Sequence, residues 1–92
     1  MDLGIVLAIA SCKRDVPVDP SAVVFGEVGL SGEIRSVSMA EQRVREAKKL
    51  GFRKVILPRA SLRILSRMKE DSELELLPVS TVSEAIAAAL KR

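Results

Sequence analysis

The segment that most constrains the fold of this chain runs from Val23 to Arg43 and reads VVFGEVGLSGEIRSVSMAEQR. Residues 22–28 are rich in valine, residues 33–37 alternate polar and apolar side chains, and a Leu-Ser-Gly turn separates the two stretches. Apolar stretches around a glycine turn predict a β-hairpin. Ser38-Met39-Ala40-Glu41 then has the spacing of a capping box, which starts a helix. The segment therefore predicts two strands followed by a helix over residues 39–50, with Gly51 as its left-handed cap.

The remaining residues predict further helices and strands. The nearly continuous apolar run of residues 3–13 predicts a helix buried on most sides. Pro17 and Pro20 exclude a helix after it. Short apolar stretches at residues 54–57 and 74–79 predict strands, the first covered on both faces. Helices are predicted at residues 60–69 and 82–90, the last with a second capping box at Thr81-Val82-Ser83-Glu84. The predicted order is α-β-β-α-β-α-β-α, an α/β fold.

Composition limits the possible chemistry. The 92 residues suit a single domain, and with two Phe and no Trp or Tyr the core must consist of aliphatic side chains. One Cys and no His exclude an internal disulfide and a zinc site within these residues, so we expect a reducing, cytoplasmic setting and a buried Cys12. Residues 1–12 superficially resemble a lipoprotein signal, but they lack a basic start and their apolar run is too short for a membrane span.

The hairpin segment also carries a family resemblance. F-G-E-V-G-L-S-G-E-I-R-S-V resembles the Lon-protease superfamily, in which a T-G-E-x-x-L-x-G-x-V hairpin precedes a helix with a catalytic lysine. That lysine position falls on Arg43, and the position of its partner serine falls just before Met1. Within the superfamily the chain is similar to the C-terminal domain of the RadA (Sms) family of bacterial DNA-repair and recombination ATPases. The resemblance implies a Lon-protease C-terminal-like (ribosomal protein S5 domain 2-type) fold. It also implies that residues 1–92 form one Lon-like domain, truncated at its N-terminal side from a larger ATPase.

Arg43 bears on whether the chain is an enzyme. A Ser-Lys dyad requires an amine that becomes neutral, whereas a guanidinium stays protonated in proteins. We therefore expect no peptidase activity from these residues. The resemblance implies instead a scaffold domain that supports ring assembly and DNA contact in the parent ATPase. Two alternatives remain: the C-terminal part of an active Lon-type Ser-Lys peptidase, and a purely structural oligomerisation domain.

The predicted second helix and the strand after it carry the candidate site. Six basic residues fall within twelve positions that contain a single acidic residue, and the whole chain has a net charge of +3. Such a cluster predicts electrostatic, sequence-independent contact with nucleic-acid phosphates, and the lack of aromatics on this helix argues against base stacking. The alternative is a solvated helix face with pairs such as Glu41–Arg45. The DNA-binding candidates are Arg43, Arg45, Lys48, Lys49, Arg53 and Lys54.

No cofactor site is predicted within the chain. Gly26, Gly29 and Gly32 punctuate a hairpin, whereas a nucleotide-binding glycine loop opens into a helix. The resemblance implies that ATP, Mg and zinc belong to upstream domains of the parent protein. It implies DNA and further copies of the same chain, in a ring-shaped homo-oligomer, as partners, with no membrane.

Overall fold

The molecule is a small α/β fold, as the sequence predicts. The structure is a computed structural model and describes residues 1–61 and 74–90. Its elements in chain order are α1 (Leu3–Arg14), β1 (Ala22–Val24), β2 (Glu27–Val28), β3 (Ile34–Arg35), α2 (Ala40–Lys49), β4 (Lys54–Pro58), the 3-10 turn η1 (Arg59–Ser61), β5 (Glu75–Val79) and α4 (Val82–Ala89). Of the helix predicted at residues 60–69, only the first two residues are described, within η1. No helix in the described ranges is long and apolar enough to cross a membrane.

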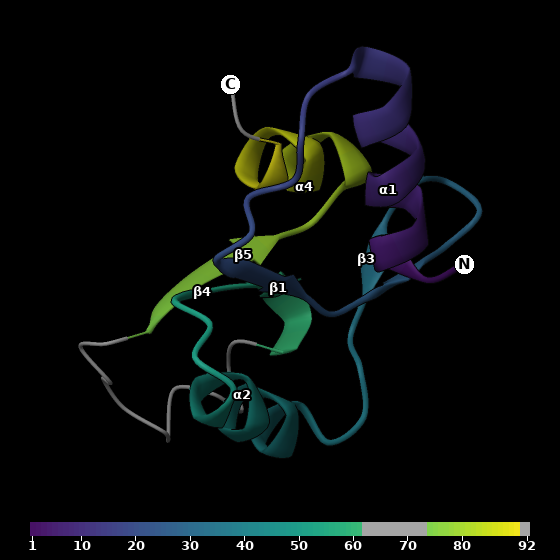
Figure 1. Cartoon of the computed structure of the whole chain (residues 1–92). Coiled ribbons are helices and arrows are strands. Elements are labelled where there is room, and N and C mark those ends of the chain that lie inside the picture. Colours follow the sequence, from purple (N-terminus) through teal and green to yellow (C-terminus); the bar gives the residue numbers. More distant parts are fainter. Residues whose placement is uncertain (62–73, 91–92) are drawn as a thin grey trace.

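A parallel sheet of order β1-β4-β5 forms the middle of the molecule. Helices α1 and α4 lie on one side of this sheet and α2 on the other (Figure 1). Successive side chains of the central strand β4 point to opposite faces, so Ile56 packs with α1 and α4 while Val55 and Leu57 pack with α2. All three side chains are at most 1% exposed. The prediction that this strand is covered on both faces is therefore confirmed.

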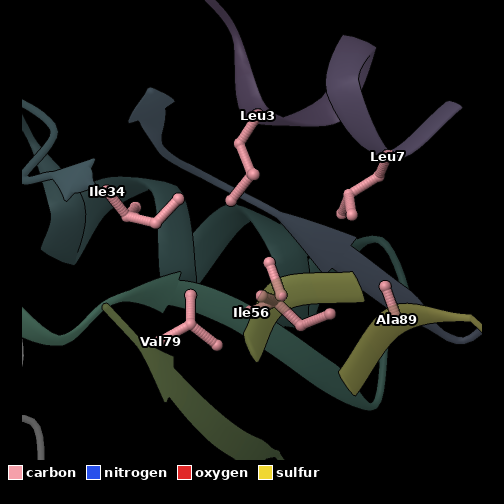
Figure 2. Close-up of a cluster of buried hydrophobic side chains, with 7 residues drawn as sticks. Leu3, Leu7, Ile34, Ile56, Val79 and Ala89 are labelled. Atoms are coloured by element: carbon pink, nitrogen blue, oxygen red, sulfur yellow. The ribbon is translucent and has the colours of Figure 1, made fainter. Parts of the chain in front are cut away.

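The larger core cluster joins five elements. It contains Leu3 and Leu7 of α1, Ile34 of β3, Ile56 of β4, Val79 of β5, and Ala85 and Ala89 of α4 (Figure 2). Burying one leucine, isoleucine or valine side chain stabilises the fold by about 1.5–3 kcal/mol. Residues of both α1 and α4 therefore pack in the same cluster as Ile56 of the central strand. This cluster therefore fixes α1 and α4 on the same face.

The predicted hairpin is shorter than expected. Residues 22–28 form two strands that belong to different sheets: β1 pairs in parallel with β4, and only β2 pairs antiparallel with β3. The break lies at Gly26, whose φ of +154° redirects the chain. The Gly26 carbonyl accepts a hydrogen bond from the Leu3 backbone N–H at 3.0 Å, so the start of α1 holds this bend in place. A single strand over 22–28 was thus a wrong prediction, because a tertiary contact with α1 decides the path.

The two predicted capping boxes have different outcomes. Helix α2 begins after Met39, which has a left-handed φ of 56°, and no side chain caps it, so the Ser38–Glu41 box does not form. At α4 the Thr81 hydroxyl accepts from the Glu84 backbone N–H at 3.2 Å, as predicted. The Glu84 carboxylate reaches back to the backbone N–H of Ser80, one residue before the cap, at 2.6 Å.

The C-terminal end of α2 is closed as predicted. Gly51 has a φ of +92° and its N–H donates to the Lys48 carbonyl, while the Phe52 N–H donates to the Ala47 carbonyl. This pair of bonds is the Schellman motif, which satisfies carbonyls that have no partner within the helix. Phe52 packs against the cluster that includes Ala47 and Val44. The motif therefore sets the direction in which the chain leaves α2 for β4.

Helix α1 is buried on one side only, which corrects the prediction of burial on most sides. Leu3 and Leu7 are buried, whereas Ile5 and Ile9 are 56% and 53% exposed. Cys12 is exposed, although the sequence predicted a buried thiol. The described elements pack only against the side of α1 that faces the sheet and α4 (Figure 1).

Candidate nucleic-acid interface

Helix α2 presents its basic side chains in several directions. Ala40, Val44 and Ala47 are its buried residues and define the side that faces the sheet. A helix turns by about 100° per residue, so Arg43 and Lys48 fall on opposite flanks of that buried side. By the same periodicity, Arg45 and Lys49 lie farthest from the sheet. The candidates on this helix therefore do not form one continuous stripe.

Arg43 makes contacts at the start of α2. Its Nε donates to the Ser38 carbonyl at 3.0 Å, and its guanidinium carbon lies 5.8 Å from the centre of the Phe25 ring. A cation at that distance over an aromatic ring is attracted by the ring's negative face. Phe25 directly follows β1, so these contacts join the start of α2 to the carboxyl end of β1. The residue at the position predicted for the Lon lysine is thus held by contacts that stabilise local structure.

Arg45 and Lys54 each bond to a carboxylate. Arg45 pairs with Glu41 at 2.9 Å on the exposed surface of α2, the i,i+4 pair that the solvated-face alternative predicted. Such exposed pairs contribute only about 0.3–0.5 kcal/mol and leave the cation accessible. The Lys54 Nζ lies 2.9 Å from the Asp19 Oδ2, and the Asp19 side chain is only 6% exposed.

Asp19 ties Lys54 into the fold. Its carboxylate also accepts from the Ser21 backbone N–H at 2.9 Å and the Ser21 hydroxyl at 2.8 Å. These bonds, the Ser21 backbone N–H first and Lys54 next, hold the pKa of Asp19 well below its usual value. In return, the Asp19 carboxylate raises the pKa of Lys54. Lys54 therefore joins the loop before β1 to the start of β4, and its charge is largely offset by Asp19.

The other three candidates lie close together along the chain at one edge of the molecule. Lys48 and Lys49 are in the last turn of α2, and Arg53 directly precedes β4; all three are exposed. The backbone N–H of Arg53 donates to the Ser21 carbonyl at 2.9 Å, which places Arg53 at the amino ends of the parallel strands. We call Lys48, Lys49 and Arg53 the basic edge. Glu75 begins β5 opposite Lys54 and adds one negative charge there.

The structure thus divides the six candidates into separate groups. Arg43 belongs with Phe25 at the carboxyl end of β1, and the basic edge lies at the amino ends of the strands. Sequence reasoning missed Asp19 as the partner of Lys54, because 35 positions separate the two residues and no local pattern connects them. Within the two described ranges, residues 1–61 and 74–90, no three His, Cys, Asp or Glu side chains gather as potential metal ligands.

Comparison with known proteins places the chain in a family. The family model described as subunit ChlI of Mg-chelatase matches residues 1–61. DNA repair protein RadA of Bacillus subtilis (strain 168) is 47% identical over 90 residues, which is 98% of this chain and 19% of that protein. RadA of Halalkalibacterium halodurans is 46% identical over 92 residues, 100% of this chain and 20% of that protein. RadA of Synechocystis sp. is 43% identical over 90 residues, 98% of this chain and 17% of that protein.

These matches confirm the resemblance to RadA that the hairpin segment indicated. The chain spans about a fifth of the length of the curated relatives it matches. The match to the family model runs from α1 to η1 and so includes all six candidate residues. The chain therefore belongs to the family described as subunit ChlI of Mg-chelatase, and its similarity to DNA repair protein RadA extends over nearly all of its residues.

Proposed function

We propose that this chain is a catalytically inactive, Lon-protease-like scaffold domain of a RadA-type DNA-repair ATPase. In this role it supports assembly of a ring of identical subunits in the cytoplasm and contacts DNA without sequence preference. The parent's ATP and Mg, and its zinc, would be held outside these residues. The similarity to proteins named DNA repair protein RadA supports the setting, and the exposed basic edge supports the DNA contact.

The basic edge is the observation that carries the DNA contact. Its three cations are exposed and lie within six positions of one another, with the turn after α2 between them. Each Lys or Arg that neutralises a phosphate releases condensed counterions, so binding of this kind weakens steeply with salt. Lys54 contributes less, because Asp19 already holds its ammonium group. The DNA backbone would therefore pass along the amino ends of the strands.

The absence of peptidase activity is proposed from the chemistry of Arg43. A general base at this position would need to lose a proton near neutral pH, and arginine does not. The Arg43 guanidinium also donates to the Ser38 carbonyl and lies over Phe25, so it has a structural use where it stands. An active Lon-type peptidase is therefore disfavoured relative to the scaffold.

The DNA contact is tested by fluorescence anisotropy with labelled single-stranded and duplex DNA over a series of salt concentrations. We expect Lys48→Glu/Lys49→Glu to weaken binding to both DNAs. For duplex DNA each lost phosphate contact flattens the plot of log affinity against log salt by about 0.9, so this variant should flatten it by about 1.8. Circular dichroism first establishes that the variant and the wild-type chain fold alike.

The control is Lys13→Glu/Arg14→Glu at the end of α1. Both variants replace two adjacent cations in the last turn of a helix, so they share the change in net charge and the loss of helix-dipole stabilisation. The two pairs end helices on opposite faces of the sheet (Figure 1). If the control weakens binding as much, the basic edge is not the contact. If wild type does not bind either DNA, the purely structural oligomerisation domain is the better explanation.

A further inference from the structure

Leu50 is an exposed apolar side chain beside the basic edge. It directly follows Lys49 at the end of α2, and it is 76% exposed. The Schellman motif does not use it, because the apolar contact that commonly accompanies this motif is made by Phe52 with the cluster that includes Ala47. Leu50 itself belongs to neither core cluster. An apolar side chain beside cations matches a ligand that carries both anionic groups and apolar faces.

The backbone holds Leu50 in a defined position. Its φ of −82° and ψ of −2° continue the helix, and its N–H donates to the Glu46 carbonyl at 3.0 Å. The next residue, Gly51, is exposed, and nothing lies within 4 Å of the position that a Cβ would take there. The surface beside Leu50 is therefore open to a ligand. Because the backbone is already fixed, little conformational freedom is lost when Leu50 is covered.

The charges around Leu50 decide which part of a DNA strand can lie against it. With about 100° between successive residues, Lys49 is on the outermost side of α2, and Lys48 and Leu50 are on the flanks to either side of it. Glu46, which is also exposed, lies one turn before Leu50 on the same flank, and its carboxylate repels phosphates. The long side chain of Lys49 reaches farther from the helix than the short side chain of Leu50. Phosphates therefore match Lys49, and the uncharged bases match Leu50.

We propose that Leu50 packs against unpaired bases of single-stranded DNA while the basic edge holds the phosphates. Leu50 then adds affinity for single-stranded DNA and none for duplex DNA. This inference rests on the DNA contact proposed above. In a duplex the bases are stacked on one another and present only their edges, at the bottom of grooves about 7.5–8.5 Å deep, so a short side chain at the protein surface meets sugar and phosphate. In a single strand the base faces are accessible, and because every base has such a face the contact carries no sequence preference.

The test repeats the anisotropy assay with labelled probes of equal length. One is a thymine-only single strand, one is the same strand in a duplex, and one is a single strand of abasic sites, which keeps the phosphates and lacks the bases. We expect Leu50→Gln to weaken binding to the thymine strand by about fivefold to tenfold and to leave the other two affinities unchanged. The slope of log affinity against log salt should not change, because no phosphate contact is lost. Leu50→Phe should bind the thymine strand at least as tightly as wild type, since an aromatic ring can stack on a base.

Leu30→Gln is the matched control, because Leu30 is a fully exposed leucine in the turn between β2 and β3, outside the basic edge. Equal weakening by the two leucine variants, or weakening by Leu50→Gln on the abasic strand or the duplex, would overturn the base contact. If wild type binds DNA and Leu50→Gln matches it on every probe, the base contact is wrong while the phosphate contact of the basic edge stands. If wild type binds none of the probes, the proposed DNA contact fails and this inference fails with it.

Discussion

Replacing Gly26 by alanine should destabilise the fold more than the same change at Gly32. Both glycines have positive φ, +154° and +82°, and a left-handed backbone costs a side chain about 1–2 kcal/mol. The two sites differ in their surroundings. A Cβ at Gly26 would lie 3.0 Å from the Ile34 Cγ2 and 3.2 Å from the Leu3 Cδ2, whereas nothing lies within 4 Å of a Cβ at Gly32. Overpacking of the core adds about 1–3 kcal/mol to the cost of the Gly26 substitution.

The expected total is therefore about 2–5 kcal/mol for Gly26→Ala and about 1–2 kcal/mol for Gly32→Ala. Alanine restricts the unfolded chain equally in both variants, so this contribution cancels in the comparison. Because the chain has no Trp or Tyr, unfolding in urea is followed by circular dichroism at 222 nm. With a slope near 1 kcal/mol per molar urea for a domain this small, the two midpoints should differ by roughly 1–3 M.

Equal midpoints for the two variants would refute the reasoning. That result would mean that Leu3 and Ile34 do not close over Gly26, and the bend between β1 and β2 would then have another cause. A Gly26→Ala variant that fails to fold remains informative, because Gly32→Ala should still fold and sets the backbone cost alone.

Three further predictions use the same urea assay. Thr81→Ala should cost about 1 kcal/mol because it removes the cap of α4, whereas Ser38→Ala should cost little because that hydroxyl caps nothing; the reverse order would contradict the cap assignment. Leu7→Ala should cost about 2–5 kcal/mol and Ile9→Ala under about 1 kcal/mol, and similar losses would show that Ile9 is buried in this chain. The pKa of Asp19 is lowered from its usual value of 3.8, so the ionised carboxylate stabilises the fold at pH values above 3.8. This stabilisation is lost as the pH falls from 3.8 through the lowered pKa of the folded state. Asp19→Asn should therefore make the stability fall less steeply between pH 4 and pH 2, and unchanged steepness would assign the acid loss to another group.

The local features were predictable from sequence wherever a single element decides them. The aliphatic run of β4 predicted a strand buried on both faces, and the glycine after α2 predicted a left-handed cap. Thr81 before an apolar run predicted the start of α4. In each case the relevant hydrogen bonds or side-chain periodicity lie within a few residues, so local pattern and structure agree.

The candidate site was less predictable because its charges are partnered over long distances. The basic residues were found from their density in the sequence, but their division into Arg43 with Phe25, Lys54 with Asp19, and the basic edge depends on contacts between separate elements. Ser38 is a local pattern that did not predict the structure. Its spacing from Glu41 matches a capping box, but Met39 is the residue that precedes α2, with a left-handed backbone, and no side chain caps the helix.

By itself, the sequence determined the α/β class, the buried central strand, the family and the basic character of residues 43–54. The tertiary structure decided that residues 22–28 divide between two sheets, that one side of α1 is exposed, and that Lys54 pairs with Asp19. The physical reason is that hydrophobic periodicity and capping act within a few residues, whereas the bend at Gly26 and the Asp19–Lys54 pair arise only when distant segments pack together.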